Sequence, residues 1–107
     1  MKSAIEVLNI IIIIILCADK PEDVTLSTSS SNVCVGSVVN FTCKADAVVD
    51  TYRLYKNDAV IQNLDGSGVT TRTLNISGQF NYSCKASNSA GTGTSNNIPF
   101  LVEGKLV

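Results

Sequence analysis

The sequence predicts an all-β protein, an antiparallel β-sandwich, on three observations. After residue 18, apolar residues alternate with polar ones in short runs, and no long window has the helical spacing of i, i+3, i+4 and i+7. Gly, Asn, Asp and Ser separate these runs, as turn residues do. Two cysteines fall on inward positions of two different runs. A chain of 107 residues provides one such domain.

The composition excludes several classes of function. The chain has 8 basic and 9 acidic residues, so it offers no basic stripe for nucleic acid. It has no histidine, which removes the usual general base, the Ser-His and Cys-His pairs, and most zinc and copper sites. The acidic residues are scattered among turns rather than paired. We therefore expect no catalytic residue, no cofactor and no metal, and we do not expect an enzyme.

Residues 1–18 have the parts of a secretory signal peptide. Lys2 gives a short positive start, Ile10 to Leu16 is an unbroken apolar run, and the small residues Cys17 and Ala18 precede an abrupt change to charge. One alternative is an uncleaved membrane anchor, although a span needs about 20 apolar residues. Another is a core element of the domain. A cleaved signal predicts a secreted, extracellular protein with no membrane span after its removal.

The runs that follow predict the strands in chain order. Val24 and Leu26 mark a first strand, before a polar stretch over residues 27–32. Further strands are expected over residues 39–45, 52–55, 59–61, 69–76, 80–86 and 98–102, with turns at 56–58 and 88–91. The alternation assigns these residues to inward positions: Val39, Phe41, Cys43, Ala45, Leu74, Ile76, Phe80, Tyr82, Cys84 and Ala86. Pro99 suits a strand at the edge of a sheet.

Cys43 and Cys84 are expected to form a disulfide bond that joins the two sheets through the core. Closing a loop of this length is worth about 4 kcal/mol in the chain-entropy model. A small domain with few aromatic residues needs such a covalent link. The alternative, two free buried thiols, requires an intracellular protein, which the signal peptide argues against.

Three segments carry a resemblance to a known family. They are Asn40-Phe41-Thr42-Cys43-Lys44-Ala45, Tyr52-Arg53-Leu54-Tyr55-Lys56-Asn57 and Tyr82-Ser83-Cys84-Lys85-Ala86-Ser87-Asn88-Ser89-Ala90-Gly91. The chain resembles the immunoglobulin superfamily over about residues 24–104, and the last segment is similar to the F strand and F–G turn of an I-set or C2-like domain. The resemblance implies an immunoglobulin-like β-sandwich with Greek-key topology.

The resemblance also implies roles for single residues. Leu54 stands at the position of the family's core tryptophan. Tyr82, two residues before Cys84, matches the tyrosine corner, whose hydroxyl would bond to the backbone of the E–F connection. Gly78 stands where the family usually has an acidic residue, so we expect the common arginine–aspartate ion pair to be missing.

Three sequons, Asn40-Phe41-Thr42, Asn75-Ile76-Ser77 and Asn81-Tyr82-Ser83, match the pattern of N-linked glycosylation. The middle residue of each is assigned inward, so Asn40, Asn75 and Asn81 are expected to point into solvent. The sequence therefore predicts a glycoprotein. Chance matches in a chain rich in Asn, Ser and Thr are the alternative.

Cys34 has no partner once Cys43 pairs with Cys84 and Cys17 leaves with the signal peptide. Three interpretations stay open: a buried free thiol, a bond to another chain that gives a disulfide-linked dimer, and a bond to Cys17 if the signal is retained.

The resemblance implies a non-catalytic cell-adhesion or recognition module that binds an extracellular protein ligand or a second copy of itself (homophilic binding). Candidate contact residues are Arg53, Tyr55, Lys56 and Asn88. The lysines and arginines of this region also fit an ordinary solvated face, and Tyr55 fits an ordinary cross-strand pair. Two alternatives are a structural component of the extracellular matrix, cross-linked through Cys34, and a fragment of a multi-domain immunoglobulin receptor.

Overall fold

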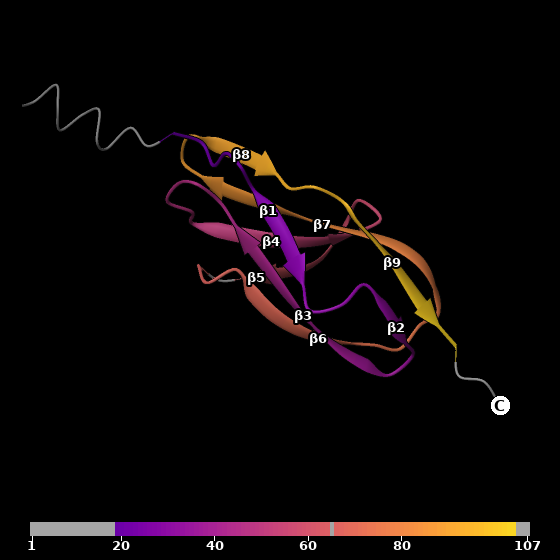
Figure 1. Ribbon diagram of the computed structural model, residues 1–107. Helices are drawn as coiled ribbons and strands as arrows, with labels where there is room; N and C mark the ends of the chain where they lie inside the picture. Colours follow the sequence, from indigo (N-terminus) through magenta and orange to yellow (C-terminus); the bar gives the residue numbers. More distant parts are fainter. Residues whose placement is uncertain (1–18, 65, 105–107) are drawn as a thin grey trace, which may run out of the picture.

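The computed structural model describes residues 19–64 and 66–104, and this part of the chain folds into nine strands with no helix (Figure 1). The predicted signal peptide, residues 1–18, lies outside the described residues, and Cys17 lies outside them with it. Within residues 19–64 and 66–104 no helix long and apolar enough to span a membrane is found.

The strands form two sheets. The three-stranded sheet has the order β1 (Thr25–Thr28), β3 (Ser37–Lys44), β6 (Val69–Leu74). The six-stranded sheet has the order β2 (Asn32–Cys34), β9 (Ile98–Glu103), β7 (Gly78–Asn88), β4 (Thr51–Lys56), β5 (Ala59–Leu64), and β8 (Gly91–Thr94) also pairs with β7. The immunoglobulin-like sandwich is confirmed. It is not wholly antiparallel, because β2 pairs with β9 in parallel.

The core lies between the two sheets, where the predicted alternation places it. In β3 the side chains of Val39, Phe41 and Cys43 are buried, and those between them face outward. The rings of Phe41 and Tyr82 have centroids 5.0 Å apart, and those of Tyr82 and Phe100 are 4.7 Å apart in an edge-on arrangement. These three rings form the centre of a core that contains no tryptophan.

Ile76, expected to point inward, instead has an exposed fraction of 65%. Strand β6 ends at Leu74 and β7, in the other sheet, begins at Gly78, so these two strands are connected by residues 75–77 alone. A connection that crosses between sheets in three residues cannot continue the strand alternation. The inward prediction for Ile76 was therefore wrong, because the strand ends two residues earlier than the sequence pattern indicates.

Two short strands were not expected. Strand β2 falls in and just after the stretch read as polar, where Val33 and Val35 pack partly against the core. Strand β8 contains Gly91 and Gly93 and no large apolar residue, so it has no alternation to detect. Its position depends on close packing instead, since a Cβ atom at Gly93 would collide with the Pro21 carbonyl oxygen and with Val24.

Pro99 lies in β9, which has a neighbouring strand on both sides along only part of its length. Strand β2 pairs with residues 101–103 of β9, whereas Pro99 lies opposite Asn81 of β7. The ring therefore sits beyond the end of the β2 pairing, where the missing N–H group costs no bond to that strand.

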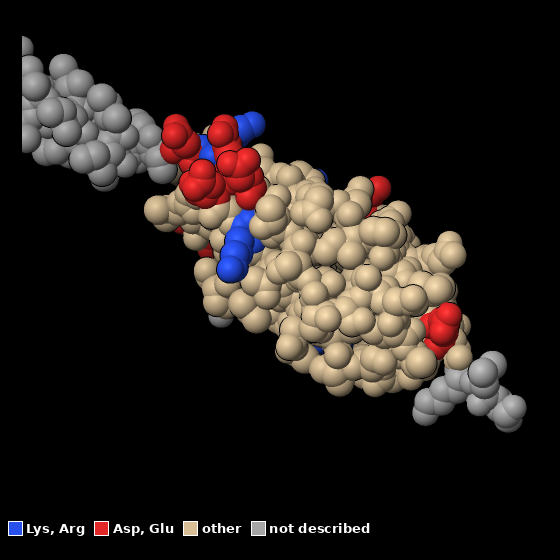
Figure 2. Space-filling view, in the orientation of Figure 1, with Lys and Arg blue, Asp and Glu red and all other residues tan. Residues whose placement is uncertain are grey.

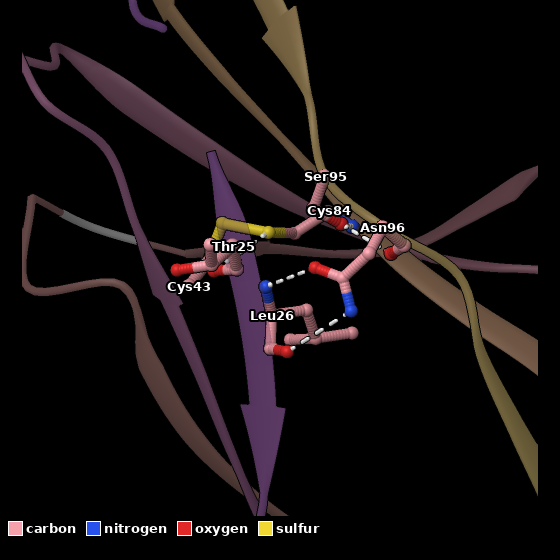
Figure 3. The surroundings of a disulfide bond; sticks show 6 residues. All are labelled: Thr25, Leu26, Cys43, Cys84, Ser95 and Asn96. Atoms are coloured by element: carbon pink, nitrogen blue, oxygen red, sulfur yellow. Dashed lines mark hydrogen bonds between the residues drawn. A yellow bond between two sulfur atoms is a disulfide. The ribbon is translucent and has the colours of Figure 1, made fainter. Parts of the chain in front are cut away.

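Side-chain amides join both edges of the three-stranded sheet to the rest of the domain. The β1 edge is joined to the segment between β8 and β9, and the β6 edge is joined to β5. At the β1 edge, the Leu26 N–H donates to Asn96 Oδ1 at 3.1 Å, and Asn96 Nδ2 donates to the Leu26 carbonyl oxygen at 3.5 Å (Figure 3). At the β6 edge, Gln62 Nε2 donates to Thr70 Oγ1 at 2.7 Å. At the β1 edge the amide of Asn96 supplies the backbone hydrogen bonds that a further strand would otherwise make, whereas at the β6 edge the bond joins two side chains.

We expect Asn96→Ala to lower the free energy of unfolding by about 1–3 kcal/mol, because it leaves the part-buried backbone groups of Leu26 without this partner. Urea denaturation followed by far-UV circular dichroism measures the effect. Asn97→Ala is the matched control, since the neighbouring Asn97 is also exposed but makes no hydrogen bond among the described residues, and it should change stability by less than about 0.5 kcal/mol. Equal stability of the two variants would contradict the role assigned to Asn96.

Candidate recognition surface

A disulfide bond between Cys43 and Cys84 joins β3 of one sheet to β7 of the other, with the two Cα atoms 6.2 Å apart (Figure 3). Both cysteines are buried. Leu54 lies opposite Cys84 in the β4–β7 register and is completely buried. The Cys84 N–H donates to Ser95 Oγ at 2.8 Å, which fixes the segment between β8 and β9 against the bond.

Tyr82 is buried beside this bond, but it does not form the hydrogen bond of a tyrosine corner. In the part of the chain that the structure describes, its hydroxyl has no hydrogen bond to the backbone of residues 75–77 or to any other group. Burial raises the pKa of the Tyr82 hydroxyl, and the positive charge of Arg72 opposes that rise.

Arg53 and Tyr55 lie together on the outer face of the six-stranded sheet. Arg53 is exposed, and its Nε donates to Asn63 Oδ1 on β5 at 3.3 Å. Tyr55 is half-buried, and the ammonium group of Lys85 on β7 lies 4.8 Å from the centroid of its ring. Arg53 and Lys85 stand directly opposite each other in the β4–β7 register. We call Arg53, Tyr55, Asn63 and Lys85 the outer-face cluster.

Lys56 does not belong to this cluster. It follows Tyr55 on β4, so its side chain leaves the opposite face, where it is in register with the buried Tyr82. Its ammonium group lies 4.0 Å from the centroid of the Phe80 ring. The structure therefore separates Lys56 from Arg53 and Tyr55, which the sequence had grouped together.

The amide of Asn88 is used within the chain. Its Nδ2 donates to the carbonyl oxygens of Asp19 at 2.7 Å and Val48 at 2.9 Å, and its Oδ1 accepts from the Ala90 N–H at 2.8 Å. These bonds tie the start of the described chain and the loop after β3 to the turn after β7. Asn88 thus has a structural role that the sequence did not indicate.

The asparagines of the three sequons are all exposed. Asn40 lies on the outer face of β3, where its Oδ1 accepts from Thr71 Oγ1 at 2.8 Å. Asn75 lies in the three-residue connection, beside the exposed Ile76. Asn81 borders a hollow of about 520 Å³ that Pro99 and Leu101 also line. The exposure expected at the three positions is present, although at Asn75 it comes from the connection and not from strand alternation.

Cys34, at the end of β2, is exposed and has no disulfide partner among residues 19–64 and 66–104. A bond to Cys17 lies outside these residues. The interpretation as a buried thiol was therefore wrong. The physical reason is that Cys34 stands in an edge strand of three residues, in register with the exposed Glu103 of β9, where its inward neighbours are Val33 and Val35.

Arg72 is a polar residue of the interior that the sequence analysis missed. It is half-buried, on the same face of β6 as Thr70 and Leu74, and its Nη1 donates to Gln62 Oε1 at 2.7 Å. An arginine at an inward position of an alternating strand was the signal that could have identified it. Among residues 19–64 and 66–104, no three His, Cys, Asp or Glu side chains gather as metal ligands would.

The charges are unevenly placed on the surface. Figure 2 shows acidic side chains gathered at the end of the molecule where the described chain starts, while most of the face in view is uncharged. This distribution differs from the continuous basic surface of a nucleic-acid-binding protein.

Two packed sheets, a disulfide bond between them and a buried strand residue against that bond define an immunoglobulin-like domain. The family model of the immunoglobulin domain matches residues 23–100, so the chain belongs to this family. No curated protein sequence matches the chain. Domains of the immunoglobulin and fibronectin families are generally non-catalytic.

Solved structures show the same fold at low sequence identity. The chain is similar to the fibronectin(III)-like modules of Clostridium thermocellum CbhA, with a TM-score of 0.63 and 20% identity over 78% of this chain and 100% of that one. It is similar to the PKD domain of the human VPS10 domain-containing receptor SorCS2, with a TM-score of 0.66 and 17% identity over 84% and 80%. The tandem Ig repeats of Dlar match with a TM-score of 0.57 and 23% identity over 75% and 49%.

Proposed function

We propose that the chain is a secreted, non-catalytic recognition module that binds an extracellular protein through the outer-face cluster. The observation that supports it is the pairing of Arg53 with Lys85. Like charges directly opposite on neighbouring strands destabilise a sheet. Among the described residues neither cation has a carboxylate partner. A negatively charged partner surface would supply the missing compensation.

The half-buried Tyr55 supports the same proposal. Its ring is half-buried with the Lys85 ammonium group beside it, so it offers apolar area at a small further cost in side-chain entropy. Arg53 is oriented by Asn63 through Nε, which leaves the rest of the guanidinium group free to bind. Tyrosine and arginine, together with tryptophan, are enriched among the residues that dominate binding at protein interfaces.

The test is surface plasmon resonance of the immobilised secreted chain against a panel of purified extracellular domains and against the chain itself. We expect at least one partner whose affinity falls about tenfold or more in both Arg53→Glu and Tyr55→Ala. Lys44→Glu is the control, because Lys44 is an exposed cation of β3 in the other sheet and undergoes the same charge change. No partner at all, or equal binding of all three variants, would refute the proposal.

Secretion and glycosylation belong to the same proposal. The signal peptide at residues 1–18 directs the chain to an oxidising compartment in which the Cys43–Cys84 bond forms and the exposed Asn40, Asn75 and Asn81 accept glycans. N-terminal sequencing of the secreted form and mass spectrometry of its glycopeptides test these two steps directly.

The exposed Cys34 supports a second candidate function, a matrix component cross-linked by a disulfide bond between copies or to another chain. On a non-reducing gel, a dimer that Cys34→Ala abolishes would favour cross-linking. A monomer in the wild-type chain would count against it and leave the recognition module as the function.

A further inference from the structure

A second hollow, of about 220 Å³, lies between the sheets near the end where β6 passes into β7. Its charged and polar lining includes Lys56, Arg72 and Tyr82, which come from β4, β6 and β7. No acidic residue lines it among the described residues. The hollow is separate from the outer-face cluster, since Lys56 points away from Arg53 across β4.

The two cations of the hollow have only neutral partners. Lys56 is half-buried with its ammonium group over the Phe80 ring, and Arg72 is half-buried with one guanidinium nitrogen bound to the amide oxygen of Gln62. Neither forms an ion pair in the part of the chain that the structure describes. Partial burial strengthens the field of both charges in the hollow, because less water screens them.

Tyr82 adds a hydrogen-bond donor with no partner of its own. Tyr82 has an exposed fraction of only 2%. Its hydroxyl makes no hydrogen bond within the described residues. Among the described residues every fully buried side-chain nitrogen or oxygen has a partner, so the unpartnered hydroxyl oxygen of Tyr82 is not fully buried and reaches the hollow that Tyr82 lines. A phenol is protonated at neutral pH and can donate, and the raised pKa of Tyr82, caused by its burial, acts in the same direction.

From these three groups we infer that the hollow binds a single carboxylate group, with Lys56 and Arg72 supplying the charge and the Tyr82 hydroxyl a hydrogen bond. The volume equals that of about seven water molecules at about 30 Å³ each, and it is smaller than the cavities that hold drug-sized ligands. It therefore suits a short carboxylate, either a free one or the side chain of an aspartate or glutamate on another protein.

The test is an NMR titration of the ¹⁵N-labelled secreted chain with acetate, against sodium chloride at equal ionic strength. We expect saturable shifts of the amide signals of Arg72, Phe80 and Tyr82 with acetate only. Lys56→Met, Arg72→Met and Tyr82→Phe should each weaken binding, the two charge variants by about tenfold or more. Arg72→Lys keeps the positive charge even where the hydrogen bond to Gln62 is lost. It should therefore bind acetate more tightly than Arg72→Met does.

Lys44→Met is the matched control, because it removes one positive charge from an exposed position of β3 that belongs neither to the hollow nor to the outer-face cluster. It should bind acetate as the wild-type chain does. A second titration uses N-acetyl-glutamate N-methylamide, which presents a glutamate side chain without other charges. Binding as tight as that of acetate assigns the hollow to side chains of partner proteins, and binding of acetate alone assigns it to free anions.

Two results would overturn the inference. One is the absence of saturable shifts with both probes, and the other is equal affinity of Lys56→Met, Arg72→Met and Lys44→Met. Neither result bears on the outer-face cluster, whose test uses Arg53 and Tyr55.

Discussion

The double variant Cys43→Ala/Cys84→Ala is expected to lose about 4 kcal/mol of unfolding free energy. The bond closes a loop with a sequence separation of 41 residues, and the chain-entropy model gives about that value for such a loop. A domain of this size has a total stability of about 4–12 kcal/mol, and this one has no tryptophan in its core. Urea denaturation under non-reducing conditions measures the loss as a shift of the midpoint.

Cys34→Ala is the control for this variant, since it removes a thiol that is exposed and unbonded among the described residues. Its stability should stay within about 0.5 kcal/mol of the wild-type chain. If the double variant unfolds at the same urea concentration as this control, the bond between the sheets does not carry the stability assigned to it.

The second large effect is expected from Gly68→Ala. Gly68 has φ +69°, and its carbonyl oxygen accepts from the Cys43 N–H at 2.8 Å just before β6 begins. An added Cβ atom would collide with the Cys43 carbonyl oxygen and lie 3.2 Å from the Tyr52 ring. The positive φ alone costs about 1–2 kcal/mol for a residue with a side chain, and the collision with backbone adds to it. We expect a loss of about 2–4 kcal/mol.

Gly66→Ala is the matched control in the same loop. A Cβ atom at Gly66 meets nothing within 4 Å, and its φ is not in the positive region. Thermal unfolding followed by circular dichroism should therefore show a clearly lower midpoint for Gly68→Ala only. Similar midpoints for the two variants would mean that the backbone near Cys43 shifts to accommodate the added Cβ atom without a loss of stability.

The sequence predicted the fold because the fold depends on local patterns. Strand alternation identified β3 and the buried half of β7, and the inward positions of Cys43 and Cys84 indicated the bond between the sheets. Alternation failed where a strand stops early, as at Ile76. It also gave no sign of β8, whose glycines pair with β7 because the chain around Pro21 packs closely against them.

The candidate sites were harder to predict because they depend on which strands become neighbours. Lys85 joins Tyr55 only through the β4–β7 pairing, and Arg72 approaches Tyr82 only through the packing of one sheet on the other. Asn88 was read as a surface contact, and nothing near it in the sequence indicates that its amide would bond to residue 19. Side chains that bridge segments far apart in the sequence leave no periodic signal.

The Asn96 bonds to Leu26 have a consequence for aggregation. An edge strand with free backbone groups is a template on which a strand of another molecule can add, and repeated addition leads to fibrils. At Leu26 both backbone groups are already bonded to Asn96, so an incoming strand would have to displace that amide first. A single asparagine side chain therefore hinders strand addition at the middle of the β1 edge.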